Sequence, residues 1–496
     1  PADTFGGRLL FYAREAPGAV QSLWSTDGLP SHSVRLTALP RNNSEFTFSA
    51  VRTARGLVFP GSGPEGVELW RSNGLRAGTR LVTDIDPSIL GGSNPTPFAA
   101  LGDRVFFYAA DGVHGEQLWT SRGDADNTER LSSFSGNWSP CDRGGFSPSH
   151  AEGSTLEFFA GYDSGTSHLW RTDGTAEGTF ALAPYVCAAS NGAAVVGDAL
   201  FFSDQNKLFR SDGSVAGTQQ VTALGDGSIE WIDTAPVIGG KLVVKQGSAT
   251  RTTRFVATDG SVAGSQELLD NRPVACVAAL GQKLLWVLGA EGASAANAFA
   301  TSDISGAAPQ EISDLGLAPG EYVAGCRTVL SESRSFWFLD VQGGTSSSHR
   351  LWVSDGTAEG TTRLADDVQI GDGLIGPSAT ATLDGVLYFG GEQAAGNFEL
   401  WMSDGTPAGT APWRLAGQSL AVEDLAAFQD RLILVIRDLR GRELWESDGS
   451  QGGTSLLGKL PDGSIGAPRL VPTTTRLFYR GEGLTTGIEL WALRPN

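Results

Sequence analysis

The sequence is poor in the residues on which metal and redox sites usually depend. It contains four cysteines, five histidines and one methionine in 496 residues. No CxxC pair occurs and the histidines share no ligand-like spacing, so a zinc site is not expected. We interpret the histidines as surface or turn residues; they are His32, His114, His150, His168 and His349.

Long hydrophobic runs and excess positive charge are also missing. No apolar stretch reaches the roughly 18 residues that a transmembrane helix requires. Asp and Glu number 55 against 36 Lys and Arg, which gives a formal net charge of −19 at pH 7. Nucleic-acid phosphates and anionic lipids do not attract such a chain unless a basic patch compensates, and the sequence shows none. We therefore expect neither nucleic-acid binding nor membrane insertion.

Familiar catalytic motifs are absent as well. The sequence has no HExxH, no phosphate loop, no Rossmann glycine pattern and no GxSxG in a strand-turn-helix context. These absences exclude the corresponding standard forms of hydrolase and nucleotide-binding enzyme. Carboxylates remain plentiful, so a pair of acids for cleaving a polysaccharide stays open.

What the sequence does contain is a repeat. Leu-Trp followed two residues later by Asp-Gly recurs along the chain, as in LWRTDGTAEGT from Leu169 and LWVSDGTAEGT from Leu351. The intervals between equivalent positions run from 39 to 52 residues, and the units are centred on positions 23, 69, 118, 169, 208, 255, 299, 351, 400, 444 and 490. Such a repeat, without linkers between its units, predicts one continuous array over residues 1–496.

Each unit has the pattern of four short strands. Between Pro97 and Phe134, Gly, Asp and Asn turn signals separate the segments PFAAL, RVFFYA, EQLWTS and TERLSS. Four antiparallel strands in about 47 residues are typical of a propeller blade. We therefore predict an all-β chain, a β-propeller of about eleven four-stranded blades. One large ring is slightly favoured because no linker interrupts the array, and two rings of about five and six blades are the alternative.

The repeated residues have plain structural interpretations. A tryptophan at one fixed place in each blade can pack between neighbouring blades and bury on the order of 150–250 Å². The SDGTxxGT segment reads as the hairpin after the third strand, in which the Asp and Thr side chains bind turn amides. A single carboxylate in each turn supplies too few ligands for a dedicated calcium site.

The cysteine positions predict two disulfides. Cys276 and Cys326 each lie four residues before a leucine that ends a strand-forming segment, and they belong to adjacent units. Cys141 and Cys187 also lie in adjacent units, about two residues out of register. We predict bridges from Cys141 to Cys187 and from Cys276 to Cys326, and hence a secreted, periplasmic or cell-surface protein. Unpaired buried thiols are the alternative.

The repeat resembles that of bacterial secreted proteins named for their ELWxxDGT motif. The resemblance rests on Glu-Leu-Trp at Glu68, Glu399, Glu443 and Glu489, and on DGTAEGT at Asp173 and Asp355. DIDPSILGGSNPTPF, from Asp84 to Phe98, is a further element of this kind. The resemblance covers nearly the whole chain and implies a secreted or surface propeller, without a defined activity. Around residues 258–303 the motif is degenerate.

Candidate binding residues lie where the repeat is irregular. The loop SFSGNWSPCDRGGFSPSH, residues 133–150, is long and rich in glycine, and it offers Trp138, Arg143 and Phe146 as ligand contacts. Trp231 and Trp413 also lie away from the Leu-Trp position. The alternative for each ring is that it caps the end of a blade.

One loop offers a candidate cation site. Asp84 and Asp86, with neighbouring serines and an asparagine, form the best local cluster of oxygen ligands for calcium. The same residues also make an ordinary loop, which is the alternative. Apart from this possible calcium, we expect no cofactor.

Taken together, these features favour a non-enzymatic binding or adhesion propeller that engages a glycan or an extracellular protein through its loops. A polysaccharide hydrolase or lyase that uses loop carboxylates around a central channel is the first alternative. An assembly scaffold on the cell surface is the second.

Overall fold

The computed structural model confirms that the chain is all-β. The residues it describes are 3–15, 19, 21–38, 50–87, 92–101, 103–134, 138–140, 149–150, 157–163, 166–185, 192–225, 227–230, 235–247, 253–270, 272–289, 297–331, 333–343, 346–366, 368–370, 380–393, 397–414, 421–438, 441–450, 452–460, 470–472, 477–483 and 487–493. No helix among these residues has the length and apolar character needed to cross a bilayer.

The chain forms two compact units, and the boundary between them passes through two strands. Unit 1 comprises residues 1–251 and 255–266, and unit 2 comprises residues 252–254 and 267–496. The strands with residues in both are β25 (Thr253–Thr258) and β26 (Gln266–Asp270).

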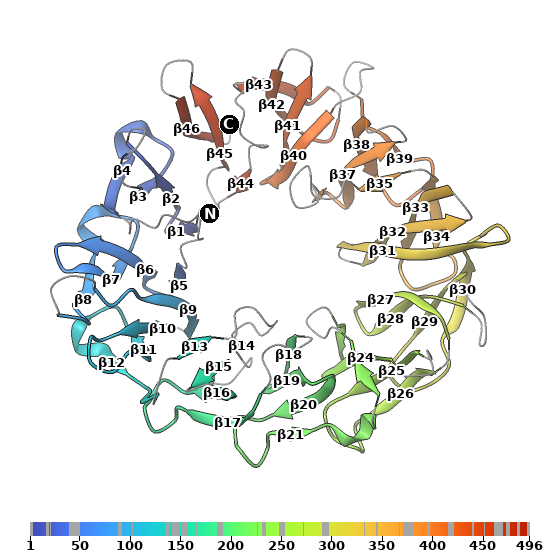
Figure 1. The fold of residues 1–496 in the computed structure, drawn as a ribbon. Helices are drawn as coiled ribbons and strands as arrows, with labels where there is room; N and C mark the ends of the chain where they lie inside the picture. The colour runs from blue at the N-terminus through green and yellow to red at the C-terminus, as the bar shows by residue number, and fades with distance from the viewer. Residues whose placement is uncertain are drawn as a thin grey trace. The chain divides into compact units, whose positions relative to one another are not determined.

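Unit 1 consists of short strands and 3-10 turns (Figure 1). Its strands are β1 (Asp3–Phe5), β2 (Arg8–Ala13), β3 (Ser22–Thr26), β4 (Val34–Ala38), β5 (Val51–Thr53), β6 (Gly56–Gly63), β7 (Gly66–Ser72), β8 (Arg80–Thr83), β9 (Thr96–Leu101), β10 (Arg104–Ala110), β11 (Glu116–Ser121), β12 (Thr128–Arg130), β13 (Ser139–Pro140), β14 (Ser149–His150), β15 (Glu157–Asp163), β16 (Thr166–Thr172), β17 (Phe180–Pro184), β18 (Ala193–Val196), β19 (Ala199–Asp204), β20 (Lys207–Ser211), β21 (Gln219–Gln220), β22 (Ser228–Ile229), β23 (Val237–Ile238) and β24 (Lys241–Gly247). Its 3-10 turns are η1 (Pro30–His32), η2 (Arg76–Gly78), η3 (Ala125–Asn127) and η5 (Thr222–Leu224).

Unit 2 has the same character. Its strands are β27 (Val274–Leu280), β28 (Lys283–Leu288), β29 (Ala298–Ser302), β30 (Gln310–Asp314), β31 (Glu321–Ser331), β32 (Arg334–Gly343), β33 (Ser346–Ser354), β34 (Thr362–Asp366), β35 (Gln369–Ile370), β36 (Thr380–Leu383), β37 (Val386–Gln393), β38 (Asn397–Ser403), β39 (Thr410–Pro412), β40 (Ala421–Phe428), β41 (Arg431–Asp438), β42 (Gly441–Ser447), β43 (Thr454–Leu460), β44 (Val471–Pro472), β45 (Leu477–Gly483) and β46 (Gly487–Leu493).

Consecutive strands pair antiparallel into four-stranded sheets, as the repeat predicts. The orders β12-β11-β10-β9 in unit 1 and β31-β32-β33-β34 in unit 2 are typical. In some sheets the first strand is split into two short pieces, such as β13 and β14, which both pair with β15. The sets β1–β4 and β5–β8 join into one larger sheet through a single pair, Ala38 opposite Ser62. The Leu-Trp step lies in the third strand, for example in β7, β11 and β33.

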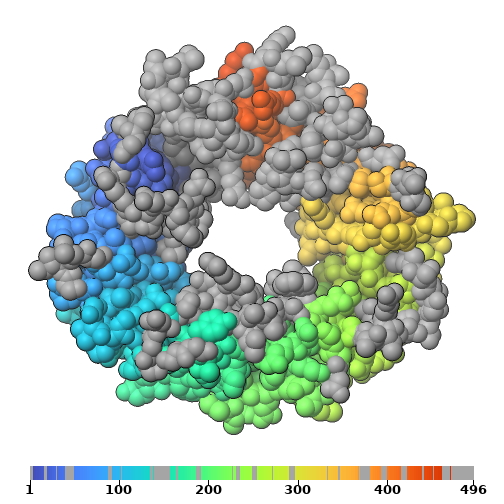
Figure 2. All heavy atoms as spheres, in the orientation of Figure 1, coloured from blue at the N-terminus to red at the C-terminus, as the bar shows by residue number. Residues whose placement is uncertain are grey.

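Successive sheets within each unit pack face to face. In β10, Val105 and Phe107 point into a cluster with the preceding sheet, whereas Phe106 and Tyr108 point into a cluster with the following one. In β32, Trp337 and Phe338 divide between two clusters in the same way. The second strand is therefore buried on both faces, which explains its nearly continuous apolar sequence. Figure 2 shows this close packing in unit 1, where the blue, cyan and green residues of successive sheets are in contact.

In most repeats the tryptophan of the Leu-Trp step lies opposite an aromatic residue on the second strand, whereas Trp445 lies opposite Leu434. Trp70 lies opposite Phe59, Trp170 opposite Phe159 and Trp352 opposite Trp337. Where the repeat has Ala300 in place of the tryptophan, the opposite residue is Trp286, so one large ring is retained. The leucine of the step is the more deeply buried member; Leu69, Leu118, Leu169, Leu351 and Leu400 are all 0% exposed.

The Asp-Gly turn is held by its own side chains. Asp404 Oδ1 accepts hydrogen bonds from the backbone N–H of Thr406 at 2.8 Å and from its hydroxyl at 2.7 Å. The hydroxyls that flank the turn, Ser403 and Thr410, share a hydrogen bond of 2.7 Å. The Thr406 hydroxyl bond holds the pKa of Asp404 below its usual range. Equivalent bonds recur at Asp173, Asp212, Asp259, Asp355 and Asp448, which confirms the prediction of a turn-locking aspartate.

Each of the two glycines in the turn has its own structural reason. The first glycine has positive φ, for example +86° at Gly405, a conformation that favours glycine. The second glycine lies beside the aspartate carboxylate. A Cβ atom added to Gly409 would lie 2.1 Å from Asp404 Oδ1. The motif therefore spaces its second glycine five residues after the aspartate because the aspartate side chain fills that place.

Cationic side chains connect the turn of one four-stranded set to the preceding set. Arg8 Nε donates to Gly74 O at 3.1 Å in unit 1, and Lys283 Nζ donates to Gly356 O at 3.2 Å in unit 2. Arg334 makes the same kind of bond to Asp404 O at 2.6 Å. Each acceptor is a main-chain oxygen of the repeated turn, which is Asn-Gly at Gly74 and Asp-Gly at the other two positions. These bonds add a directional contact to the apolar packing between neighbouring sheets.

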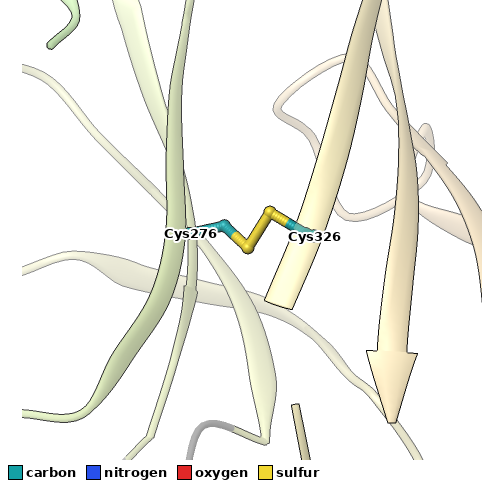
Figure 3. The surroundings of a disulfide bond; sticks show 2 residues. All are labelled: Cys276 and Cys326. Atoms are coloured by element: carbon teal, nitrogen blue, oxygen red, sulfur yellow. A yellow bond between two sulfur atoms is a disulfide. The ribbon is translucent and has the colours of Figure 1, made fainter. Parts of the chain in front are cut away.

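A disulfide joins the first strands of two neighbouring sheets in unit 2 (Figure 3). Cys276 in β27 is bonded to Cys326 in β31, so the predicted bridge between these residues is confirmed. The bridge closes a segment with a sequence separation of 50 residues, and closing a loop of that length stabilises the fold by about 4 kcal/mol in the chain-entropy model. The other predicted bridge, from Cys141 to Cys187, lies outside the described residues.

The turn that follows β42 offers a matched pair of substitutions. A Cβ atom on Gly453 would lie 2.0 Å from Asp448 Oδ2, whereas a Cβ atom on Gly452 would meet nothing within 4 Å. We expect Gly453→Ala to displace the carboxylate from its bonds to Ser450 and lower the free energy of unfolding by about 1–2 kcal/mol. Gly452→Ala should stay within about 0.5 kcal/mol of wild type. Urea denaturation followed by circular dichroism measures both, and equal effects of the two variants would contradict the proposed packing.

Candidate functional site

Trp138, predicted to contact a ligand, is part of the core. Its side chain is 4% exposed. Its ring stacks on Phe134 with centroids 4.0 Å apart and meets Trp170 edge-on at 6.0 Å. Tyr108 and Phe159 complete this aromatic cluster between the β9–β12 sheet and the next one. Its burial favours the packing alternative for Trp138 over an exposed platform for a ligand.

Trp413, like Trp138, is buried rather than exposed to a ligand. It follows β39, is 5% exposed and donates its backbone N–H to Leu400 O at 2.7 Å. Its indole Nε1 donates to Gly449 O, in the turn of the next sheet, at 3.3 Å. Trp413 therefore performs the function that lysine and arginine perform at other sheet contacts. The remaining predicted contacts, Arg143, Phe146 and Trp231, lie outside the described residues.

The loop that carries Asp84 and Asp86 is organised around a buried glutamate. Glu68, of the Glu-Leu-Trp motif, is 0% exposed. Its carboxylate accepts bonds from Ile85 N at 3.2 Å, Ser93 N at 2.8 Å and Ser93 Oγ at 2.6 Å. Burial raises the pKa of Glu68, although these hydrogen bonds oppose the rise. The glutamate of the motif thus fixes the connection to the next sheet.

The two predicted calcium ligands differ in solvent exposure. Asp84 is exposed and Asp86 is 9% exposed. Within the described ranges, no three His, Cys, Asp or Glu side chains gather closely enough to hold a metal ion. The calcium site at Asp84 and Asp86 stays a prediction from the sequence.

Gln117 takes the place of Glu68 in the next repeat and makes a different set of bonds. Its Oε1 accepts from Phe134 N at 2.8 Å and from Ser132 Oγ at 2.9 Å. Its Nε2 donates to His114 O at 2.9 Å and to Phe134 O at 3.2 Å. Glutamate and glutamine at this position are therefore each matched to their own loop.

The longest strands of unit 2 carry a polar face with groups free for a ligand. β31, β32 and β33 have 11, 10 and 9 residues, whereas β27, β28 and β29 of the preceding sheet have 7, 6 and 5. Figure 1 shows these long strands in yellow. Register places Tyr322 opposite Gln342 and Asp340 opposite His349, and alternation along β32 puts both pairs on the same face. We call these four residues the polar face.

Hydrogen bonds fix the side chains of the polar face. Tyr322 Oη donates to Gln342 Oε1 at 2.8 Å, and the Tyr322 side chain is 43% exposed. His349 Nδ1 lies 2.9 Å from Asp340 Oδ1. Asp340 is about half exposed, His349 is less exposed, and Gln342 is exposed. The tyrosine ring, the second carboxylate oxygen, the amide nitrogen and imidazole Nε2 can all face an incoming molecule.

A buried arginine holds the base of this extension from the opposite face. Arg350 is 8% exposed and donates to Leu315 O at 3.1 Å and to Glu321 Oε2 at 2.8 Å. A hydrogen bond from the Ala318 N–H, with the nearby Arg350 charge, holds the pKa of Glu321 below its usual range. The strands that carry the polar face therefore rise from a firmly anchored base.

The sequence did not single out these four residues. The available signal was the length of the unit, since the interval from position 300 to position 352 is the longest of the repeat at 52 residues. Extra length in a repeat unit is usually placed in loops or hairpin ends, which often carry binding residues.

Comparisons with known proteins give no family. No family model matches, and no curated protein matches. The tricorn protease is similar over 99% of this chain at 11% identity and a TM-score of 0.30, and this chain spans 57% of its length. The β-propeller domain of the Trilobed protease from Pyrococcus furiosus is similar over 70% of this chain and 94% of its own, at 10% identity and a TM-score of 0.27. An oligogalacturonate lyase in complex with manganese is similar over 91% of this chain and 96% of its own, at 11% identity and a TM-score of 0.32. None of these similarities assigns an activity to this chain.

Exchanging glutamate and glutamine at the first position of the Glu-Leu-Trp motif should destabilise the protein in both directions. Glu68→Gln puts an amide N–H₂ against donors, and Gln117→Glu puts a carboxylate against carbonyl oxygens. We expect each variant to lower the free energy of unfolding by about 1–3 kcal/mol, because a buried polar group loses its partner. Chemical denaturation measures the loss, and a change of only a few tenths of a kcal/mol in either variant would contradict it.

Glu157 should make stability depend on pH. Burial raises the pKa of this carboxyl to about 7 from its ordinary value of 4.5, and its side chain is 2% exposed. Because the folded state holds the proton more tightly than the unfolded state, stability from this group is full below pH 4.5 and falls as the pH rises through 7. The loss amounts to about 3 kcal/mol.

Glu157→Gln should remove this dependence. The difference in unfolding free energy between the variant and wild type should shift in favour of the variant by about 3 kcal/mol between pH 4.5 and pH 8. The other titrating groups are common to both proteins, so they cancel in this difference. A difference that stays constant over this range would show that Glu157 does not titrate as described.

Proposed function

We propose that this chain is a β-propeller that acts outside the cytoplasm and binds a glycan through the polar face. The four-stranded sheets, stacked face to face within each unit, have the form of propeller blades. The disulfide between Cys276 and Cys326 is compatible with a secreted, periplasmic or cell-surface location.

The finer architecture that we propose is a single ring of about eleven blades. It is supported by the contacts that the turns at Gly74, Gly356 and Asp404 make with the preceding set of strands. Repeated along the array, this contact needs a preceding neighbour for every set of strands, and a closed ring supplies one for the first set as well. Class averages from electron microscopy, viewed along the ring axis, would distinguish one ring from two smaller ones.

The polar face carries the binding proposal because of its chemistry. A sugar ring presents apolar C–H faces and a rim of hydroxyl groups that both donate and accept. Tyr322 offers an exposed aromatic surface for the C–H faces of the sugar. Donors and acceptors for its hydroxyl groups come from Gln342, Asp340 and His349. These polar atoms stand on paired strands rather than on a loop, so their spacing is set before a ligand arrives.

Binding to immobilised glycans tests this function directly. Wild-type protein should bind a defined class of glycan, and Tyr322→Ala should weaken that binding by about tenfold, as expected when one aromatic contact is lost. Tyr162→Ala is the matched control, because Tyr162 is an exposed tyrosine on β15, 36% exposed. An unchanged affinity of the Tyr322 variant, or a blank array, would refute the proposal.

Two further readouts separate the alternatives. A blank glycan array with specific capture of an extracellular protein would indicate a protein-binding function instead. Release of shorter sugars from a bound polysaccharide would indicate a hydrolase or lyase, in which two carboxylates act together.

A further inference from the structure

A glycine interrupts the polar face beside Asp340. Gly325 of β31 lies directly opposite Asp340 of β32, and a bulge between Val323 and Gly325 separates it from Tyr322. Gly325 does not have a positive φ, so its backbone conformation, next to the bulge, does not require glycine. Glycine inside a strand weakens the strand and often marks a place where a ligand or another backbone comes close. Gly325 is therefore a candidate for such a place.

The space over Gly325 opens onto one oxygen of Asp340. Among the described residues, a Cβ atom added to Gly325 would have a single neighbour within 4 Å, which is Asp340 Oδ2 at 3.4 Å. The other oxygen, Oδ1, lies 2.9 Å from His349 Nδ1, which belongs to β33 on the opposite side of β32. No hydrogen bond to Asp340 Oδ2 is found in the part of the chain that the structure describes. We call this space, bounded by Gly325 and Asp340 Oδ2, the notch.

The notch and Tyr322 are neighbours on the polar face. Tyr322 pairs with Gln342, and Gly325 pairs with Asp340. Asp340 and Gln342 are two residues apart on β32, which corresponds to about 7 Å along the strand. The Tyr322 side chain is 43% exposed and that of Asp340 is 49% exposed. A sugar that stacks on the tyrosine ring can therefore extend a hydroxyl group over Gly325 to Asp340 Oδ2.

We propose that the ligand of the polar face is a neutral glycan, and that Gly325 admits one of its free hydroxyl groups to Asp340 Oδ2. This inference rests on the glycan-binding function proposed above. An ionised carboxylate accepts hydrogen bonds and donates none, so it binds a hydroxyl group but repels a carboxylate or a sulfate in the same place. A hydrogen bond to a charged acceptor is also stronger than one between neutral groups. The notch thus selects among glycans by charge and by space.

Two alanine substitutions test the notch on immobilised neutral glycans. Gly325→Ala adds a methyl group at an ordinary contact distance from Asp340 Oδ2, so the variant should fold while the ligand hydroxyl loses its place. We expect binding to weaken about tenfold, as for the loss of one charged hydrogen bond. Gly390→Ala, on the face of β37 that Tyr388 turns toward the following sheet, meets nothing within 4 Å among the described residues and should bind like wild type. Unchanged binding by Gly325→Ala, with weakened binding by Tyr322→Ala, overturns this inference and leaves the glycan-binding function standing.

Asp340→Asn tests the selection by charge, and it decides the matter if Gly325→Ala does not fold. Wild-type protein should prefer neutral glycans to sulfated or uronic-acid-containing glycans of equal length by about tenfold or more. Asp340→Asn should reduce this preference at least severalfold, because the repelling charge is gone. An unchanged preference in the variant overturns the inference. So does a wild-type preference for the acidic glycans, which Arg327, on the same face of β31, would favour. Wild-type protein that binds no glycan refutes the glycan-binding function itself.

Discussion

The packing of this protein depends on sheets that are apolar on both faces. A sheet whose second strand alternates large side chains between two clusters, as β10 and β32 do, cannot leave either face in water. Such a sheet is stable only between two neighbours. Stability therefore belongs to the stack rather than to any one repeat, and loss of a neighbour exposes a face as large as the sheet.

This arrangement leaves polar chemistry only at the ends and edges of the sheets. There, most of the conspicuous acidic residues are occupied by the fold itself. The turn aspartates bind the turn amides, and Glu68 binds the loop to the next sheet. A strongly acidic composition thus says little about ligands. The polar face differs because strands β31 to β33 outgrow those of the preceding sheet, and its side chains keep donors and acceptors to spare.

The sequence predicted those features that depend on neighbours along the chain or on equivalent positions in the repeat. Short apolar segments separated by turn signals predicted an all-β chain of four-stranded sheets, and equal repeat positions predicted the bond from Cys276 to Cys326. Side-chain contacts outside the repeat pattern were missed. Trp138 is buried because Phe134 and Trp170 close around it, and Tyr322 meets Gln342 only through strand register. Neither partnership leaves a local pattern.

The acceptors of the bonds between neighbouring sets of strands are main-chain oxygens, and this matters for how the repeat can evolve. Arg8, Lys283 and Arg334 each bind a main-chain carbonyl of the repeated turn, and such a carbonyl is present whatever the side chains of the turn. A unit copied by gene duplication and placed elsewhere in the array would meet the same type of acceptor in the neighbouring turn. Its cationic side chain could bind that acceptor without a compensating mutation in the neighbour. The acceptor of this contact is therefore kept when whole units are gained or lost during evolution, although the donor differs, as Arg334 and Trp413 show.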